Sequence, residues 1–371
     1  NVVDNIILPQ YRSFRTEVDA LSTRADAFLV SPSTTTLDAL RQQFSTTWLQ
    51  WQRVAPFEFG PAESVFLANS LNNFPLDQQA LDDNIAAGSW SFDNPSAFDK
   101  GFPALDYLLY GLGDTPAAVV DVFTTDPQAA AYLDYLTDVV ADIQTRTIQV
   151  VDEWENGYRT SFISNTGTAA GTSLSLIINS LNLHYENLRR DKIGIPAGVL
   201  TLGFTNPNKV EAPHSRLSLA LAKAGLEASL GYFQGGSGEG LDDLLNYMGA
   251  EKDGQALADL ILDQYALAQS QLNAIDGDLQ VAVEQKTRIA RDLLKSLAPG
   301  LGDDFVRNIL GAPQETGAQR DWLRRRIEAL KSSLDRRREP EARFLRQVAD
   351  YLIEKVVWCI GGDGWAYDIG Y

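Results

Sequence analysis

The chain has 371 residues and carries 31 Lys and Arg against 49 Asp and Glu, a formal net charge of −18 at pH 7. Hydrophobic residues make up 44% of the chain, which is enough to bury a sizeable core and excludes a disordered protein. The acidic excess argues against nucleic acid or an anionic membrane surface as the main partner, because phosphate groups repel a negative field. One cysteine and two histidines exclude a disulfide framework, a multi-cysteine metal site and a three-histidine zinc site within one chain.

Helical periodicity dominates the chain from its start. Residues 2–28 predict a first helix that Pro9 kinks, and Thr35 with Asp38 predicts a capping box for the second helix. Apolar residues at three- and four-residue steps predict further helices at 37–51, 133–154, 174–192, 214–233, 257–275, 280–297 and 320–358. Residues 55–102 are rich in Pro, Gly, Asn and Asp and predict short helices and loops. Since no stretch shows the alternation typical of strands, we predict an all-α protein built from two helical bundles.

The small polar residues 164–172 follow the long helix 133–154 and predict a domain junction. We therefore expect an N-terminal bundle over 1–165 and a C-terminal bundle over 166–371. No apolar run approaches the roughly 18 residues that a membrane span needs. Because residue 1 is Asn rather than Met, a removed export signal would account for the start of the chain.

Two segments hold the residues that could carry chemistry. In Glu211-Ala-Pro-His214 the Glu–His spacing matches one half of a carboxylate-bridged di-iron site, but no second copy of this pattern exists. Pro213 predicts a helix start there, with Ser215 and Ser218 one turn apart, and a helix N-terminus suits a small anion. The sequence contains neither a nucleophile elbow nor a His-Glu-x-x-His motif, so we predict no catalytic residue.

The second segment is Gly101-Phe-Pro-Ala-Leu-Asp-Tyr-Leu-Leu-Tyr-Gly111. Gly101 ends a loop, Pro103 occupies the first turn of a helix, and Asp106 lies near its positive end. On its own this pattern predicts a helix start that needs no function.

Several segments taken in order resemble the imelysin-like family. They include the opening Asn1-Val-Val-Asp-Asn-Ile-Ile-Leu-Pro9, Trp51-Gln-Arg53, Asn73-Phe-Pro-Leu-Asp77, Asp191-Lys-Ile-Gly-Ile-Pro196 and residues 211–218. The segment 101–111 resembles the family signature Gly-x-His-x-x-Glu. This chain departs from the signature at its two positions with titratable side chains, where Pro103 replaces His and Asp106 replaces Glu. The departure argues against metal binding at the motif and against metallopeptidase activity.

The resemblance implies an exported bacterial protein, periplasmic or anchored to the envelope by a lipid, and associated with iron or haem uptake. It implies two helical bundles with a ligand site between them, which we place at Trp51, Arg53, Gly101, Pro103, Asp106, Glu211, His214, Ser215 and Ser218. No cofactor is certain; a metal such as iron or another divalent cation, haem and a small anion are the candidate ligands.

Two alternatives stay open. One is a metallopeptidase-like imelysin activity. The other is a surface scaffold that binds an envelope protein partner, for which the arginine clusters 324–326 and 336–338 are the candidate face. With acidic residues among them, these clusters are typical of a solvated, salt-bridged helix.

Overall fold

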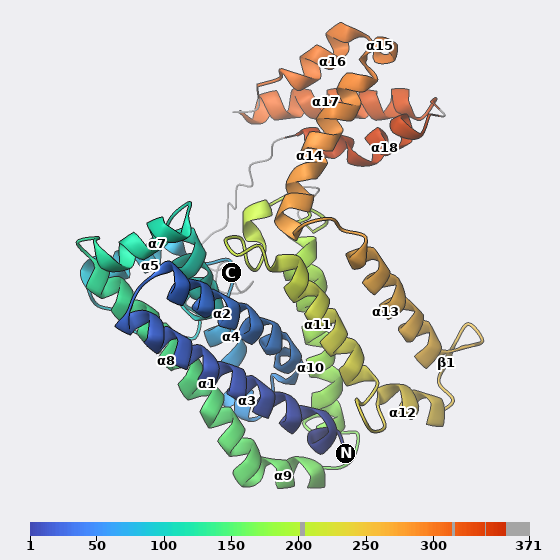
Figure 1. The fold of residues 1–371 in the computed structure, drawn as a ribbon. Helices are drawn as coiled ribbons and strands as arrows, with labels where there is room; N and C mark the ends of the chain where they lie inside the picture. The colour runs from blue at the N-terminus through green and yellow to red at the C-terminus, as the bar shows by residue number, and fades with distance from the viewer. Residues whose placement is uncertain (201–204, 314–315, 338, 354–371) are drawn as a thin grey trace. The chain divides into compact units, whose positions relative to one another are not determined.

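The computed structural model describes residues 1–200, 205–313, 316–337 and 339–353, and these form an almost entirely α-helical protein (Figure 1). The α-helices of its first part are α1 (Leu8–Val30), α2 (Thr34–Val54), α3 (Pro61–Ser64), α4 (Leu67–Leu71), α5 (Gln78–Ala87), α6 (Gly101–Asp106), α7 (Pro116–Thr124), α8 (Ala129–Glu153) and α9 (Arg159–Ser164). Those of its later part are α10 (Ser173–Asn187), α11 (Ser218–Phe233), α12 (Leu241–Tyr247), α13 (Leu257–Asn273), α14 (Leu279–Ser296), α15 (Ala298–Leu301), α16 (Asp303–Leu310), α17 (Gly317–Leu334) and α18 (Pro340–Val348). The prediction of an all-α protein is confirmed.

Short segments of other regular structure complete the chain. The π- and 3-10-helical segments are η1 (Val3–Ile7), η2 (Ala55–Phe57), η3 (Tyr107–Gly111), η4 (Trp154–Tyr158), η5 (Leu188–Gly194), η6 (Pro207–Lys209) and η7 (Ala349–Leu352). Strands β1 (Glu251–Lys252) and β2 (Gln255–Ala256) form a small antiparallel hairpin. Within the described residues, none of the helices is long and apolar enough to cross a membrane.

The chain divides into two compact units, each with its own apolar core. Unit 1 comprises Asn1–Pro196 and Asn206–Ala282, and unit 2 comprises Ala197–Thr205 and Val283–Tyr371. The predicted boundary at residues 165/166 falls between α9 and α10, inside unit 1, and stays a prediction. The lone cysteine, Cys359, lies outside the described residues.

In unit 1, α1 packs along both α2 and α8, and α2 also packs against α11 (Figure 1). Aromatic side chains fill this core: Phe102 of α6 stacks on Trp48 of α2, with ring centroids 5.6 Å apart and planes 12° apart. The contact between α2 and α11 joins the first helices of the chain to those that follow residue 173.

Helix ends differ from the prediction in three places. The capping box of α2 is formed by Ser33 and Thr36 rather than Thr35 and Asp38. Residues 213–216 form turns, so α11 begins at Ser218 and not near 214. The single helix predicted over 320–358 is wrong: α17 ends at Leu334 and α18 starts with Pro340, because proline has no N–H to continue a helix.

Unit 2 packs α14 and α16 to α18 around a small core that includes Leu294, Ile309, Ile327 and Leu345. Two arginines of α17 are engaged within the unit. Arg324 forms an ion pair with Asp321 at 2.6 Å, and the Arg326 guanidinium lies 4.9 Å from the centre of the Trp322 ring. This supports the interpretation of a solvated, salt-bridged face; Arg338 lies outside the described residues.

Candidate functional site

The motif segment forms α6 and continues directly into η3. Gly101 has φ +69°, and a Cβ atom built there would lie 2.3 Å from the carbonyl oxygen of Leu71. Only glycine permits this backbone approach, so the first motif residue sets α6 against the end of α4. Pro103 is buried in the first turn of α6, where its missing N–H costs no helical hydrogen bond.

Asp106 is buried at the end of α6, and both of its carboxylate oxygens accept backbone hydrogen bonds. The N–H of His214 donates to Oδ2 and the N–H of Ser215 donates to Oδ1, each at 2.9 Å. Burial raises the pKa of Asp106 to about 6, while these hydrogen bonds pull it down. Asp106 thus fixes the turn that precedes α11 to the end of α6.

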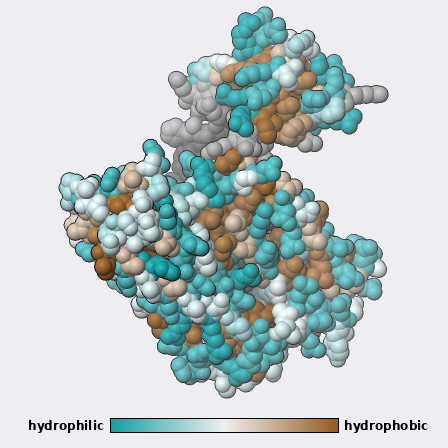
Figure 2. Space-filling view, viewed as in Figure 1, coloured by the Kyte–Doolittle hydropathy of each residue, from teal (hydrophilic) through white to brown (hydrophobic). Residues whose placement is uncertain are grey.

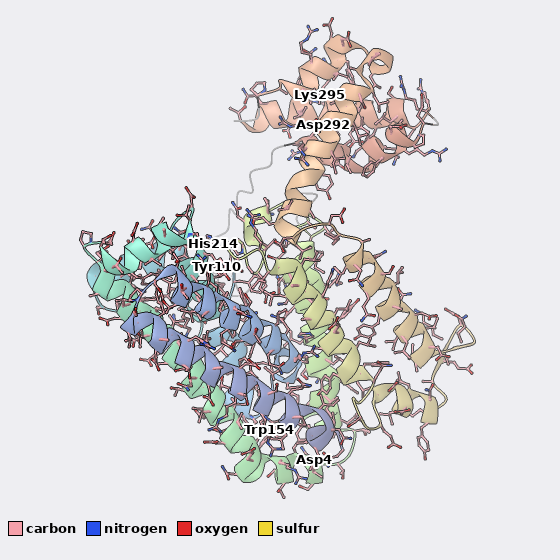
Figure 3. The ribbon with its side chains drawn as sticks, in the orientation of Figure 1. Asp4, Tyr110, Trp154, His214, Asp292 and Lys295 are labelled. Atoms are coloured by element: carbon pink, nitrogen blue, oxygen red, sulfur yellow. The ribbon has the colours of Figure 1, made fainter. Side chains whose placement is uncertain are left out.

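His214 packs against η3 beside this turn (Figure 3). The ring of His214 lies 5.4 Å from that of Tyr107, and a Cβ on Gly111 would come within 2.8 Å of His214 Nδ1. Burial lowers the pKa of His214. Arg41 of α2 donates from Nε and Nη2 to the carbonyl of Leu109, at 2.9 and 2.6 Å, and so anchors η3.

Glu211 lies in a buried polar cluster on the other side of Pro213. Its Oε1 accepts hydrogen bonds from Gln52 Nε2 at 3.1 Å, from Asn72 Nδ2 at 2.7 Å and from Lys192 Nζ. Lys192 Nζ also donates to Gln52 Oε1 at 3.0 Å. Burial lowers the pKa of Lys192, and the Glu211 carboxylate opposes this shift. Glu211 Oε2 is buried and has no hydrogen-bond partner within the described part of the chain.

The N-terminus of α11 is held by two further groups. Ser218 Oγ accepts a hydrogen bond from the N–H of Ala212 and donates to its carbonyl oxygen. Asp278 Oδ1 accepts from the N–H of Leu219 at 2.8 Å. Asp278 therefore satisfies an N–H of the first turn of α11, as a capping residue does, whereas Ser218 ties the start of α11 to Ala212.

Two predicted site residues lie elsewhere. Trp51 is inside the aromatic core, with ring centroids 5.6 Å from Phe14 and 6.3 Å from Phe102. Arg53 is exposed and lies 3.9 Å from Glu227, in a surface cleft between α2 and α11. The structure records no contact of either residue with Asp106 or Glu211. The predicted set therefore divides into the Asp106 turn, the Glu211 cluster and these two separate positions.

The residues present do not fit a bare metal ion. Both oxygens of Asp106 already accept backbone N–H groups, and the ammonium of Lys192 lies beside Glu211, where it would repel a cation. Over the described ranges, no group of three or more His, Cys, Asp or Glu is arranged to hold a metal.

Sequence reasoning missed the residues that complete the Glu211 cluster. Lys192 and Gln52 lie in segments that resemble the family, which is the available signal, whereas nothing local marks Asn72. The second histidine, His184, is buried; its Nε2 lies 3.1 Å from the carbonyl oxygen of Gly225, and burial lowers its pKa to about 4.

Comparison with known proteins gives one family over most of the chain. The family model described as Imelysin (Peptidase_M75) matches residues 7–301. Iron-regulated protein A of Synechococcus elongatus is 21% identical over 322 residues, which cover 83% of this chain and 84% of that protein. A solved structure from Parabacteroides distasonis, provisionally named iron-regulated protein A precursor, superposes with a TM-score of 0.61 at 20% identity. It covers 76% of this chain and 86% of that one, and shows the same fold.

A second kind of relative matches a shorter stretch. A protein of Synechocystis provisionally named pyruvate-flavodoxin oxidoreductase is 47% identical over 92 residues. These residues are 25% of this chain and 8% of that protein, so the chain spans less than a tenth of this relative's length.

Proposed function

The chain belongs to the imelysin family, and on this premise we propose that it is an exported protein of iron uptake that binds a ligand rather than cleaving one. The proposal rests on the residues at the two signature positions of the motif and on their contacts. Pro103 stands where the signature has a ligating His, and both oxygens of Asp106 accept backbone N–H groups. The motif therefore serves to join α6 to the turn before α11.

The iron-related role is supported by the relative named iron-regulated protein A, which matches 83% of this chain. Export is supported by the name "precursor" of the structural neighbour. We place the ligand where the α2 side of unit 1 meets the start of α11, beside Glu211. Its Oε2 is a buried acceptor that lacks a donor among the described residues, so a ligand hydroxyl or amine would fit there. Because Lys192 neutralises Glu211, an iron complex or an organic ligand suits this position better than a bare cation.

The peptidase alternative requires a general base, a nucleophile or a metal in the site. The ring of His184 is bonded to a backbone carbonyl and the ring of His214 packs on Tyr107, and neither imidazole contacts a serine or a carboxylate side chain in the interactions that the structure records. Binding is therefore the better-supported activity.

Ligand-induced stabilisation tests the proposal. We expect the thermal unfolding midpoint to rise with at least one of ferrous salt, ferric salt, ferric citrate or hemin, since a ligand at a hundred times its Kd adds about 2.7 kcal/mol to the unfolding free energy. Glu211→Gln should reduce this rise, whereas Asp114→Asn, which removes an exposed carboxylate, should retain it. No rise with any of the four ligands at millimolar concentration would contradict the proposal.

A further inference from the structure

Three helices of unit 1, α10, α11 and α13, come together in a way that leaves one side uncovered. α11 packs against both α10 and α13. The three meet at Tyr265, whose ring lies 6.1 Å from Tyr185 of α10 and 6.1 Å from Phe233 of α11. Tyr265 also shares a 2.7 Å hydrogen bond with Ser229 of α11. α12 packs against α13, and residues of α12 and of the hairpin β1–β2 line a groove together with α10 and α13.

A groove of about 1060 Å³ opens between them. Its α10 wall includes Leu174, Ile178 and Leu181, and its α13 wall includes Leu257, Leu260 and Ile261. Both sets follow the three- and four-residue steps of a helix face. Ile178 is 39% exposed, so the apolar surface reaches solvent, and Figure 2 shows brown hydrophobic patches among the teal residues on the visible face of unit 1.

The shape of the groove favours a helix as its occupant. In a bundle each helix packs against two neighbours; α10 and α13 both contact α11, and both also line the groove, where a further helix would pack against the two of them. The α10 wall runs from Leu174 to Tyr185, which corresponds to about 16 Å or three helical turns. Polar residues such as Asn179, Asn182 and Gln264 also line the groove and can bind the polar edge of such a helix.

Charge indicates what kind of helix would bind. Unit 1 contains 15 Lys and Arg against 35 Asp and Glu, a net charge of −20, whereas unit 2, with 16 against 14, is close to neutral. The charged residues that line the groove, Lys252 and Asp253, cancel each other. The field of unit 1 therefore attracts a basic partner and repels a second copy of the same unit.

We infer that this groove binds an amphipathic helix of about three turns, with apolar residues on one face and Lys or Arg on the other, supplied by another protein. The inference is independent of the iron-related role, because it uses neither Asp106 nor Glu211.

A labelled amphipathic peptide of Leu and Lys, about four turns long, tests the inference by fluorescence anisotropy with the full chain. The counterpart with Glu in place of Lys is the charge control. We expect micromolar binding of the Lys peptide and at least tenfold weaker binding of the Glu peptide. Ile178→Glu and Leu260→Glu should each weaken binding of the Lys peptide at least tenfold.

The matched control is Leu183→Glu, since Leu183 lies on the same helix and is 53% exposed but does not line the groove. This variant should bind as the wild type does, and circular dichroism should show that all variants are folded. No binding of the Lys peptide, or equal loss in Ile178→Glu and Leu183→Glu, would overturn the inference. Self-association that Ile178→Glu abolishes, without peptide binding, would also overturn it and identify a second copy as the occupant.

Discussion

At the residue scale, Asp106 stands where the family signature has Glu, and here its side chain has a structural role. It has lost the signature glutamate's extra methylene, and its two oxygens accept the N–H groups of His214 and Ser215. Charge-assisted hydrogen bonds of this kind contribute roughly twice as much as neutral ones. Burial opposes them, which is why the pKa of Asp106 rises to about 6 instead of falling.

This shift predicts a pH dependence of stability. The folded state holds the Asp106 proton up to about pH 6, whereas the unfolded state releases it near pH 4, so this group's contribution to the unfolding free energy falls as pH rises between those values. Asp106→Asn cannot ionise. The stability advantage of wild type over Asp106→Asn should therefore shrink by about 2 kcal/mol from pH 4 to pH 7 in urea titrations.

The control is Asp114→Asn, which removes an exposed carboxylate in the loop before α7. A difference between wild type and Asp106→Asn that is constant across this pH range would show that Asp106 ionises as a solvated carboxylate, contrary to its burial.

At the scale of elements, the periodic helices were predictable and the contacts of the candidate site were not. The apolar stripe from Leu133 to Trp154 located α8 because periodicity is a local property of the sequence. The turns at 213–216 and the late start of α11 depend instead on Asp106, more than 100 residues away, and on Asp278. The Glu211 cluster likewise draws Gln52, Asn72 and Lys192 from three separate segments, so no local pattern could have assembled it.

Capping of α11 by Asp278 gives a prediction at this scale. Asp278→Ala removes the acceptor of the Leu219 N–H, and loss of a capping side chain costs about 0.5–2 kcal/mol. Amide hydrogen exchange should speed up at residues 219–222, at the start of α11, while exchange in α8 should change little. Uniform acceleration over both helices would indicate global destabilisation rather than loss of a cap.

At the scale of the whole molecule, the chain combines two units that differ in charge and in core. The imelysin model ends at residue 301, so most of the segment 283–371 that belongs to unit 2 lies beyond it. Because each unit has its own apolar core, the two should unfold as separate cooperative transitions.

Calorimetry of two core variants tests this organisation. Leu40→Ala in unit 1 and Leu330→Ala in unit 2 each remove a fully buried side chain and should cost about 2–5 kcal/mol. We expect each variant to lower the midpoint of one transition and leave the other in place. If both variants shift a single transition together, the units unfold as one.

The motif joins α6 to the turn before α11, and we propose that the protein binds its ligand rather than cleaving it. The most direct measurement is a time course of unfolded casein incubated with wild type and with Asp106→Asn, each with and without a metal chelator. We expect no cleavage above the buffer control in any of the four reactions. Cleavage by wild type that disappears both with the chelator and in Asp106→Asn would contradict the proposal, because Asp106 would then act in a metal-dependent peptidase site.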